Sequence, residues 1–192
     1  MLAICLFHIS GCKEKEIKVE RLFCDAETVE GKRFVCHGEY FDNGNLRTDE
    51  MAYSGKYSVM LNKNRKYGMT YRINDVQEGE RFIVRVKRYS ETGSGSLILS
   101  AQEVRLGYFV AHTPTTTKVE NGWMELSLDV VIAQGVDSIS VYLFNPNDEP
   151  VYFDDLEIIR MPKFDPIYPD LQVLQIRVND LDMAEMTRLR EY

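Results

Sequence analysis

The sequence lacks the short motifs that mark common catalytic and nucleotide-binding sites. It contains no GxSxG, P-loop, GxGxxG or HExxH motif. It also has no CxxC pair or Cys/His cluster of the kind that holds zinc. No apolar run approaches the ~20 residues that a transmembrane helix needs. These absences predict that the chain, as it stands, is not an enzyme and has no internal membrane span.

The charge balance also excludes one class of partner. The net charge is -7, whereas nucleic acids and anionic membrane surfaces attract basic proteins. We therefore expect no nucleic acid partner. A carbohydrate partner is compatible with this charge, because it is neutral and is recognised by aromatic and polar groups. The 44% hydrophobic content is that of an ordinary globular domain.

The N-terminus resembles a bacterial lipoprotein signal. Residues 1–9 are almost all apolar, and Ser10, Gly11 and Cys12 follow them. Ile9-Ser10-Gly11-Cys12 is similar to a lipobox, in which the cysteine is diacylated and becomes the mature N-terminus. The resemblance implies a signal at 1–12, a charged spacer at 13–16 like the surface-export signal of Bacteroidetes lipoproteins, and an outer-membrane, cell-surface location. The alternative is a plain N-terminal strand or an uncleaved tail.

A period of two dominates the chain from residue 17 to residue 160. Leu126, Leu128 and Val130 alternate with polar residues, as in a half-buried antiparallel strand. The same alternation occurs around Val84 and Val141. Further strands are expected at 18–24, 33–41, 57–62, 69–73, 96–102, 108–111 and 151–159. Such short strands, separated by turn residues, predict an all-β antiparallel sandwich or jelly roll.

The composition changes after this domain. Residues 161–170 contain three of the six prolines and are expected to form a stiff, extended linker. Residues 171–192 predict one strand, and a capping box at Asp182 and Glu185 predicts the start of a helix. A strand and one helical turn cannot bury a core alone, so this short extension is expected to be the truncated start of a second domain.

Two cysteines, Cys24 and Cys36, fall inside the predicted β domain. They form an even pair in what the signal suggests is an oxidising compartment. A disulfide between them and two buried free thiols are both compatible with the sequence.

Four segments, in order, resemble the galactose-binding-like jelly rolls that include carbohydrate-binding modules of xylanases and cellulases. They are Cys24-Asp25-Ala26-Glu27, the "SGKYS" turn at 54–58, Gly122-Trp123, and the closing strand with Tyr152-Phe153-Asp154-Asp155. The resemblance covers about 140 residues. It implies a galactose-binding-like β-sandwich that binds a glycan or polysaccharide.

The same resemblance implies a structural calcium ion. Asp154 shares a face with Leu156 and Ile158 along the last strand, so its carboxylate is expected to point inward and to need a cation or strong donors. Glu27 and the backbone carbonyl of Lys56 would complete the ligand set. Alternatively, Asp154 caps backbone donors or pairs with a basic residue.

Outward aromatic and polar residues are the candidates for sugar binding. The outward residues are Arg85, Tyr142 and Phe144, and Tyr108 and Asn145 are expected nearby in loops. The single tryptophan, Trp123, begins an amphipathic strand, and we expect it to pack rather than to bind.

The tail adds a shorter resemblance. Residues 174–183 with Arg188 are similar to the opening of spore-coat-protein-H-type kinase domains. Together these features predict a lipid-anchored surface module that binds glycans and positions a downstream domain. The alternatives are a structural spacer and the N-terminal accessory part of a larger surface enzyme.

Overall fold

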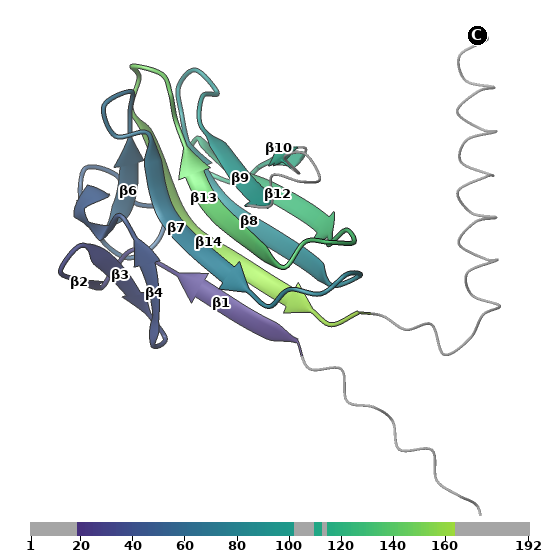
Figure 1. Cartoon of the computed structure of the whole chain (residues 1–192). Coiled ribbons are helices and arrows are strands. Elements are labelled where there is room, and N and C mark those ends of the chain that lie inside the picture. The colour runs from purple at the N-terminus through teal and green to yellow at the C-terminus, as the bar shows by residue number, and fades with distance from the viewer. Residues whose placement is uncertain (1–18, 102–109, 113–114, 164–192) are drawn as a thin grey trace, which may run out of the picture. The chain divides into compact units, whose positions relative to one another are not determined.

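The computed structural model describes residues 19–101, 110–112 and 115–163, which form two antiparallel β-sheets packed on one another (Figure 1). This arrangement confirms the predicted antiparallel β-sandwich. The predicted signal and spacer, nearly all of the proline-rich linker and the C-terminal extension lie outside the described residues. The described part of the chain contains no helix with the length and hydropathy that a membrane crossing requires.

One layer, named here the β8 sheet, contains seven strands. In spatial order these are β11 (Thr115–Lys118), β12 (Trp123–Val131), β8 (Arg81–Tyr89), β14 (Val151–Met161), β6 (Ser58–Leu61) and β5 (Arg47–Thr48), and β1 (Glu20–Cys24) pairs with β14.

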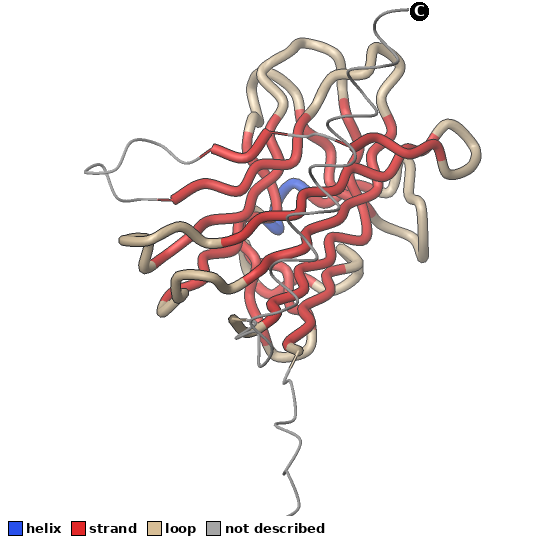
Figure 2. The backbone as a smooth tube through the Cα atoms, turned by 90° about the vertical axis from the view of Figure 1, so that its right-hand side faces the viewer, coloured by secondary structure: helices blue, strands red, loops and turns tan. Residues whose placement is uncertain are grey.

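The other layer, named the β7 sheet, also contains seven strands. In spatial order these are β10 (Val110–His112), β9 (Ser96–Ala101), β13 (Ser138–Phe144), β7 (Tyr67–Asn74), β4 (Glu39–Asp42), β3 (Arg33–Cys36) and β2 (Val29–Glu30). A short 3₁₀ helix, η1 (Gly44–Leu46), follows β4 and is the blue segment in Figure 2.

The core lies between the sheets and follows the predicted alternation. In β12, Leu126 and Leu128 are buried and Asp129 is exposed. Phe41 of the β7 sheet and Phe153 of the β8 sheet are among the large side chains with no exposed surface. Because each strand uses one face for this core, only the outer faces and the connecting turns are available for binding.

One predicted strand is wrong. Residues 33–41 form the hairpin β3–β4 instead of a single strand, with Phe34 opposite Phe41. His37 and Gly38 both have positive φ, at 52° and 87°, and this conformation turns the chain back. The remaining expected strands inside the described residues are present within three residues of their expected bounds, and the strands β2, β5 and β11 were not expected.

Cys24 and Cys36 lie on β1 and β3, on opposite layers of the sandwich. Both are buried free thiols, one of the two alternatives that the sequence allowed. Their thiols hydrogen-bond, and this bond together with burial raises the pKa of Cys24. The disulfide remains a prediction for an oxidising compartment, where it would stabilise the fold by ~2–3 kcal/mol by closing a short loop.

An ion pair joins the end of β14 to the turn before β8. The Nε and Nη2 atoms of Arg160 lie 2.9–3.2 Å from the two carboxylate oxygens of Glu80, and Nη2 also donates to the Asp75 carbonyl at 2.9 Å. Glu80 is only 8% exposed. Its charge therefore depends on Arg160 for compensation.

We expect Arg160→Leu to lower the free energy of unfolding by about 2–3 kcal/mol, because charge-assisted hydrogen bonds to a buried carboxylate are lost. The matched control is Arg81→Leu, since Arg81 pairs with Asp129 where both side chains are about half exposed, and such pairs contribute less than about 1 kcal/mol. Urea unfolding measures both variants. Adding Glu80→Gln to Arg160→Leu should recover part of the loss, and equal losses in the two single variants would contradict this role.

Candidate functional site

The outer face of the β8 sheet is covered by charge pairs. Lys87 Nζ lies 2.6 Å from Glu125 Oε2, and Arg81 pairs with Asp129 on the same face. Arg21 pairs with Glu157, which also lies 3.6 Å from Arg85. Because these charged groups already form ion pairs with one another, the face resembles an ordinary solvated surface.

One end of this face is covered by the chain itself. Trp123 and Tyr89 lie opposite each other on the outer side of β12 and β8, with ring centroids 5.9 Å apart. Tyr53 packs on Trp123 at 5.6 Å, and Trp123 is only 4% exposed. Trp123 therefore packs, as expected, although it lies outside the main core between the sheets.

The outer face of the β7 sheet carries a group of three aromatic rings, named here the ring group. Tyr142 and Phe144 project from β13, and Tyr67 projects from the neighbouring strand β7. The Tyr67 ring centroid lies 5.8 Å from that of Tyr142 and 5.1 Å from that of Phe144. Tyr67 is 53% exposed. The group therefore offers apolar ring surface to solvent.

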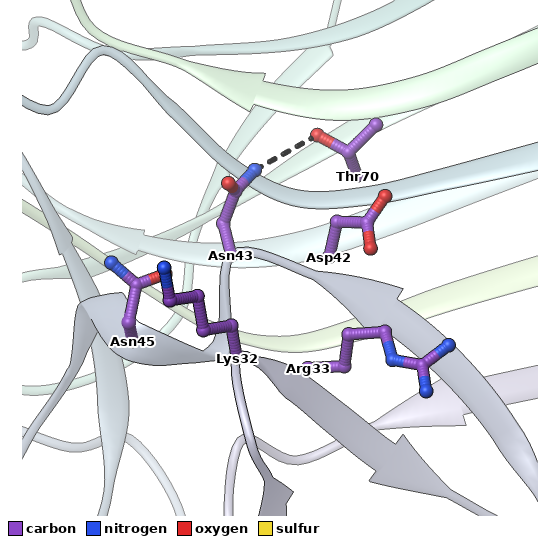
Figure 3. Close-up of a pocket in the computed structure, with 6 residues that line it drawn as sticks. All are labelled: Lys32, Arg33, Asp42, Asn43, Asn45 and Thr70. Atoms are coloured by element: carbon purple, nitrogen blue, oxygen red, sulfur yellow. Dashed lines mark hydrogen bonds between the residues drawn. The ribbon is translucent and has the colours of Figure 1, made fainter.

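A polar pocket of about 490 Å³ opens beside β7, β4 and β3 (Figure 3). Its lining side chains are all polar or charged: Lys32, Arg33, Asp42, Asn43, Asn45 and Thr70. The Asn43 amide donates to Thr70 Oγ1 at 3.2 Å, which fixes one wall. Asn43 adopts φ 70°, a left-handed conformation that asparagine tolerates better than most residues.

The pocket and the ring group share one face. Thr70 pairs with Asp42 across β7 and β4, and Asp42 pairs with Arg33 across β4 and β3. Residues opposite each other in a sheet project to the same side, so these three side chains share one face. This is the outer face of Tyr67, because Tyr71 packs against the core and the register of β7 shifts between Gly68 and Tyr71. The face thus runs from aromatic rings over β13 and β7 to polar groups over β4 and β3.

A close backbone contact builds the pocket. Gly44 donates its N–H to the Lys32 carbonyl at 2.8 Å. A Cβ at Gly44 would lie only 2.6 Å from the Arg33 carbonyl carbon, so no side chain fits there. This approach brings Asn43 and Asn45 beside Lys32 and Arg33.

The residues predicted to bind sugar do not form one site. Tyr142 and Phe144 lie on the outer face of the β7 sheet, whereas Arg85 lies on the opposite side of the sandwich, on the outer face of the β8 sheet. Alternation within a strand shows which residues point outward, but it does not show which of the two sheets the strand belongs to. Tyr108 lies outside the described residues.

Asn145 is not placed to contact a ligand. It has no exposed surface, and its amide donates to the carbonyls of Leu61 and Glu149 at 3.0 and 2.9 Å. Its side-chain oxygen accepts the N–H of Asn147 at 3.1 Å. The side chain is fully used in holding the turn between β13 and β14.

Asp154 is buried, but not on the side that the sequence suggested. It lies opposite Lys87, whose side chain pairs with Glu125 on the outer face. The register shifts between Asp154 and Glu157, and Asp155 has φ 51°. This bulge adds one residue, so Asp154 and Leu156 lie on opposite sides of β14.

The turn before β6 covers Asp154 and supplies its donors. Oδ2 accepts the N–H groups of Tyr53 and Ser54 at 2.8 and 3.1 Å, and Oδ1 accepts that of Asp155 at 2.8 Å. Burial raises the pKa of Asp154 to about 7, although these N–H groups act in the opposite direction.

Glu27 binds the same turn two residues further along. Its Oε1 accepts the N–H groups of Lys56 and Tyr57 at 2.7 and 2.8 Å. A Cβ at Gly55 would lie 2.4 Å from this oxygen, so the turn must carry glycine there. Two of the three predicted calcium ligands, Glu27 and Asp154, thus hold one turn through its backbone donors.

The fit of a calcium ion to these residues is incomplete. Among the described residues, no three acidic, histidine or cysteine side chains converge closely enough to hold a metal. Nevertheless, negative charge accumulates: burial raises the pKa of Asp155, and Asp25 and Glu27 add to that rise. A cation would relieve this repulsion, and calcium remains a prediction.

Comparison with solved structures shows which fold this is. The CBM22-1 xylan-binding domain from Paenibacillus barcinonensis Xyn10C matches with a TM-score of 0.50 and 18% identity, over 74% of this chain and 94% of that one. The C-terminal family 22 carbohydrate-binding module of Clostridium thermocellum Xyn10B matches with a TM-score of 0.51 and 17% identity, over 74% and 94%. The tandem CBM22-1–CBM22-2 domain of Paenibacillus barcinonensis Xyn10C matches with a TM-score of 0.52 and 17% identity, over 83% and 49%.

The chain has the β-sandwich fold of these carbohydrate-binding modules. No protein-family model matches it, and no curated protein does. At these identities the likeness concerns the fold.

The sequence did not indicate the pocket. The sequence Asp42-Asn43-Gly44-Asn45 has the composition of a turn and shows nothing more, and Lys32, Arg33, Thr70 and Tyr67 belong to no recognisable binding pattern. A turn of four polar residues directly after a strand is a usable sign, because turns at the rim of a sheet often hold binding residues.

The raised pKa of Asp154 predicts a pH-dependent stability. The folded state holds this proton more tightly than the unfolded chain, whose pKa lies near 3.8. Stability is therefore highest at acid pH and is lost as the pH rises toward 7. In EDTA, we expect a change from pH 8 to pH 5 to raise the free energy of unfolding by about 2–3 kcal/mol.

The control is Asp154→Asn, which removes this titrating group and should remove most of the pH dependence, leaving the contribution of Asp155, whose pKa is also raised. Urea unfolding at both pH values measures it. Calcium bound near Asp154 would lower its pKa, so adding calcium should flatten the profile of the wild type. A profile that calcium leaves unchanged would argue against the metal site.

Proposed function

We propose that this chain is a non-catalytic module that binds a carbohydrate chain on the outer face of the β7 sheet. The observation that carries the proposal is the ring group, Tyr67, Tyr142 and Phe144, placed beside a polar pocket on one continuous face. Sugar rings stack their C–H faces on aromatic rings, and their hydroxyls bind polar side chains. Both kinds of group are present on this face, so an extended glycan can stack on the rings and bind the polar side chains at the same time.

The alternative face of the molecule supports this choice. On the β8 sheet, charged side chains pair with one another, and Tyr53 covers Trp123. A ligand there would have to displace contacts that already exist. On the β7 sheet, Tyr67 is more than half exposed. The ligand would therefore gain contacts at a smaller cost.

The pocket is suited to binding rather than to hydrolysis. Glycoside hydrolysis ordinarily uses two carboxyl groups on either side of the scissile bond. Asp42 is the single carboxylate among the described residues that line the pocket. The matched xylan-binding domains share this fold, which supports a binding role for the chain.

We further propose that lipid on Cys12 attaches this module to the outer membrane at the cell surface, and that the module positions a domain beyond residue 171. The support is the lipobox-like Ile9-Ser10-Gly11-Cys12 and the proline-rich segment at 161–170. A lipid anchor would keep the binding face close to the cell while a bound glycan extends away.

The ring group predicts the effect of aromatic truncation. We expect Tyr67→Ala and Tyr142→Ala each to raise the Kd for a bound oligosaccharide at least tenfold, about 1.4 kcal/mol, through loss of stacking. The matched control is Tyr152→Ala, because Tyr152 lies on the outer side of the β8 sheet. Isothermal titration against a panel of neutral and acidic oligosaccharides measures binding, and thermal unfolding shows that each variant folds. Binding to no oligosaccharide would favour a structural spacer.

The lipid anchor is tested independently. We expect Cys12→Ala to move the chain from the membrane fraction to the soluble fraction of the cells that express it, and to abolish incorporation of labelled fatty acid. Cys36→Ala is the control. Fatty acid incorporation that persists in Cys12→Ala would contradict the anchor.

A further inference from the structure

The polar pocket contains two cations that no acidic side chain neutralises. Lys32 and Arg33 form no ion pair with any acidic residue in the described part of the chain. By contrast, Arg81, Lys87 and Arg160 on the β8 sheet are all paired. Other described cations, such as Arg47, Arg65 and Lys118, also form no ion pair. What distinguishes Lys32 and Arg33 is that they line one pocket on the face that carries the ring group.

The Arg33 side chain is held in place, and its N–H donors stay free of hydrogen bonds to other described residues. Its guanidinium carbon lies 4.2 Å from the centroid of the Tyr40 ring, a cation–π contact that fixes the plane of the group. Neither its side chain nor that of Lys32 donates a hydrogen bond to another described residue. An ordered guanidinium with free N–H groups is the arrangement that binds a carboxylate or sulfate through two parallel hydrogen bonds.

The single acid of the pocket does not cancel these charges. Asp42 lies opposite Arg33 in the β3–β4 pair, yet no ion pair joins them. Figure 3 shows the Lys32 side chain beside Asn45 and the Arg33 guanidinium extending away from Asp42. The residues that line the pocket thus include two cations and one carboxylate. Glu30 lies opposite Arg33 in the β2–β3 pair outside the lining, forms no ion pair with it, and accepts the Tyr40 hydroxyl instead.

The geometry points to an acidic glycan: we infer that the carbohydrate carries carboxylate or sulfate groups, which Lys32 and Arg33 bind while neighbouring sugars stack on the ring group. Figure 3 shows the two cationic side chains extending apart, so each binds its own acidic group. This inference rests on the proposed function and names its ligand class. Strands β13, β7, β4 and β3 are consecutive neighbours in the sheet. Three strand spacings are about 14 Å, so an oligosaccharide and not a single sugar reaches both regions.

The overall charge of the protein acts against an acidic ligand at long range. A protein with a net charge of -7 repels an acidic polysaccharide at long range. Binding must then come from local contacts, and removing one pocket cation should have a large effect. Neutral sugars experience no such repulsion and do not need these cations.

The experiment compares one glycan in two charge states. The full chain is titrated with an oligouronate and with the same oligosaccharide after each carboxylate is reduced to a primary alcohol. A sulfated oligosaccharide of equal length forms a third arm and distinguishes sulfate from carboxylate. We expect the wild type to bind at least one acidic oligosaccharide at least tenfold more tightly than the neutral one.

The variants are Lys32→Gln and Arg33→Gln, with Lys118→Gln as the control. Lys118 is exposed on β11, in the β8 sheet, and its substitution makes the same charge change as Lys32→Gln. We expect each pocket variant to raise the Kd for the acidic oligosaccharide five- to tenfold and to leave that for the neutral one within twofold. Lys118→Gln should change neither.

Two results would overturn the inference. One is equal affinity of the wild type for the acidic and the reduced oligosaccharide, and the other is unchanged acidic binding in both pocket variants. If Tyr142→Ala still weakens binding in those cases, the proposed function stands and only the ligand class is wrong. If the wild type binds no oligosaccharide of any charge, both fail.

Discussion

Burial of one side of every strand against the opposite sheet is the constraint on which this molecule depends. The alternation that places Leu126 and Leu128 in the core necessarily places Ser127 and Asp129 on the surface. Each sheet is therefore left with one outer face, and function must be found there or in the turns. The two outer faces of this sandwich have been used differently. On the outer face of the β8 sheet, charged side chains pair with one another and a turn covers one end. On the outer face of the β7 sheet, aromatic rings are exposed and the pocket cations form no ion pairs.

That covering turn explains why the acidic residues belong to the fold more than to a binding site. Asp154 and Glu27 together accept four N–H groups from the turn between Tyr53 and Tyr57. Buried N–H groups must find acceptors, and carboxylates are strong ones. The same turn also places the Tyr53 ring on Trp123. The closing strand thus fixes a turn that seals the β8 sheet and leaves the β7 sheet as the free face.

Sequence reasoning was reliable where one physical rule decides the outcome, and failed where two rules compete. Period-two alternation placed β8, β12, β13 and β14 correctly, because burial of one face determines it. The bulge at Asp155 reverses this alternation, so Asp154 was assigned to the wrong side. Arg85 and Tyr142 were correctly read as outward, but alternation does not say which sheet a strand joins. Asn145 was mistaken for a ligand residue because a turn asparagine can hold its own turn instead of a sugar.

The pocket could not be found from sequence for a further reason. Its residues come from β3, β4, β7 and the turn at η1, and they meet only because the Gly44 backbone approaches Arg33 too closely for any side chain. That approach joins segments that hydrophobic patterning treats as separate. Arg33 remains unpaired although an acid lies opposite it on either side of β3, Glu30 in β2 and Asp42 in β4. The location of Lys32 and Arg33 beside the aromatic rings makes an anionic sugar chain the ligand that satisfies both the cations and the rings.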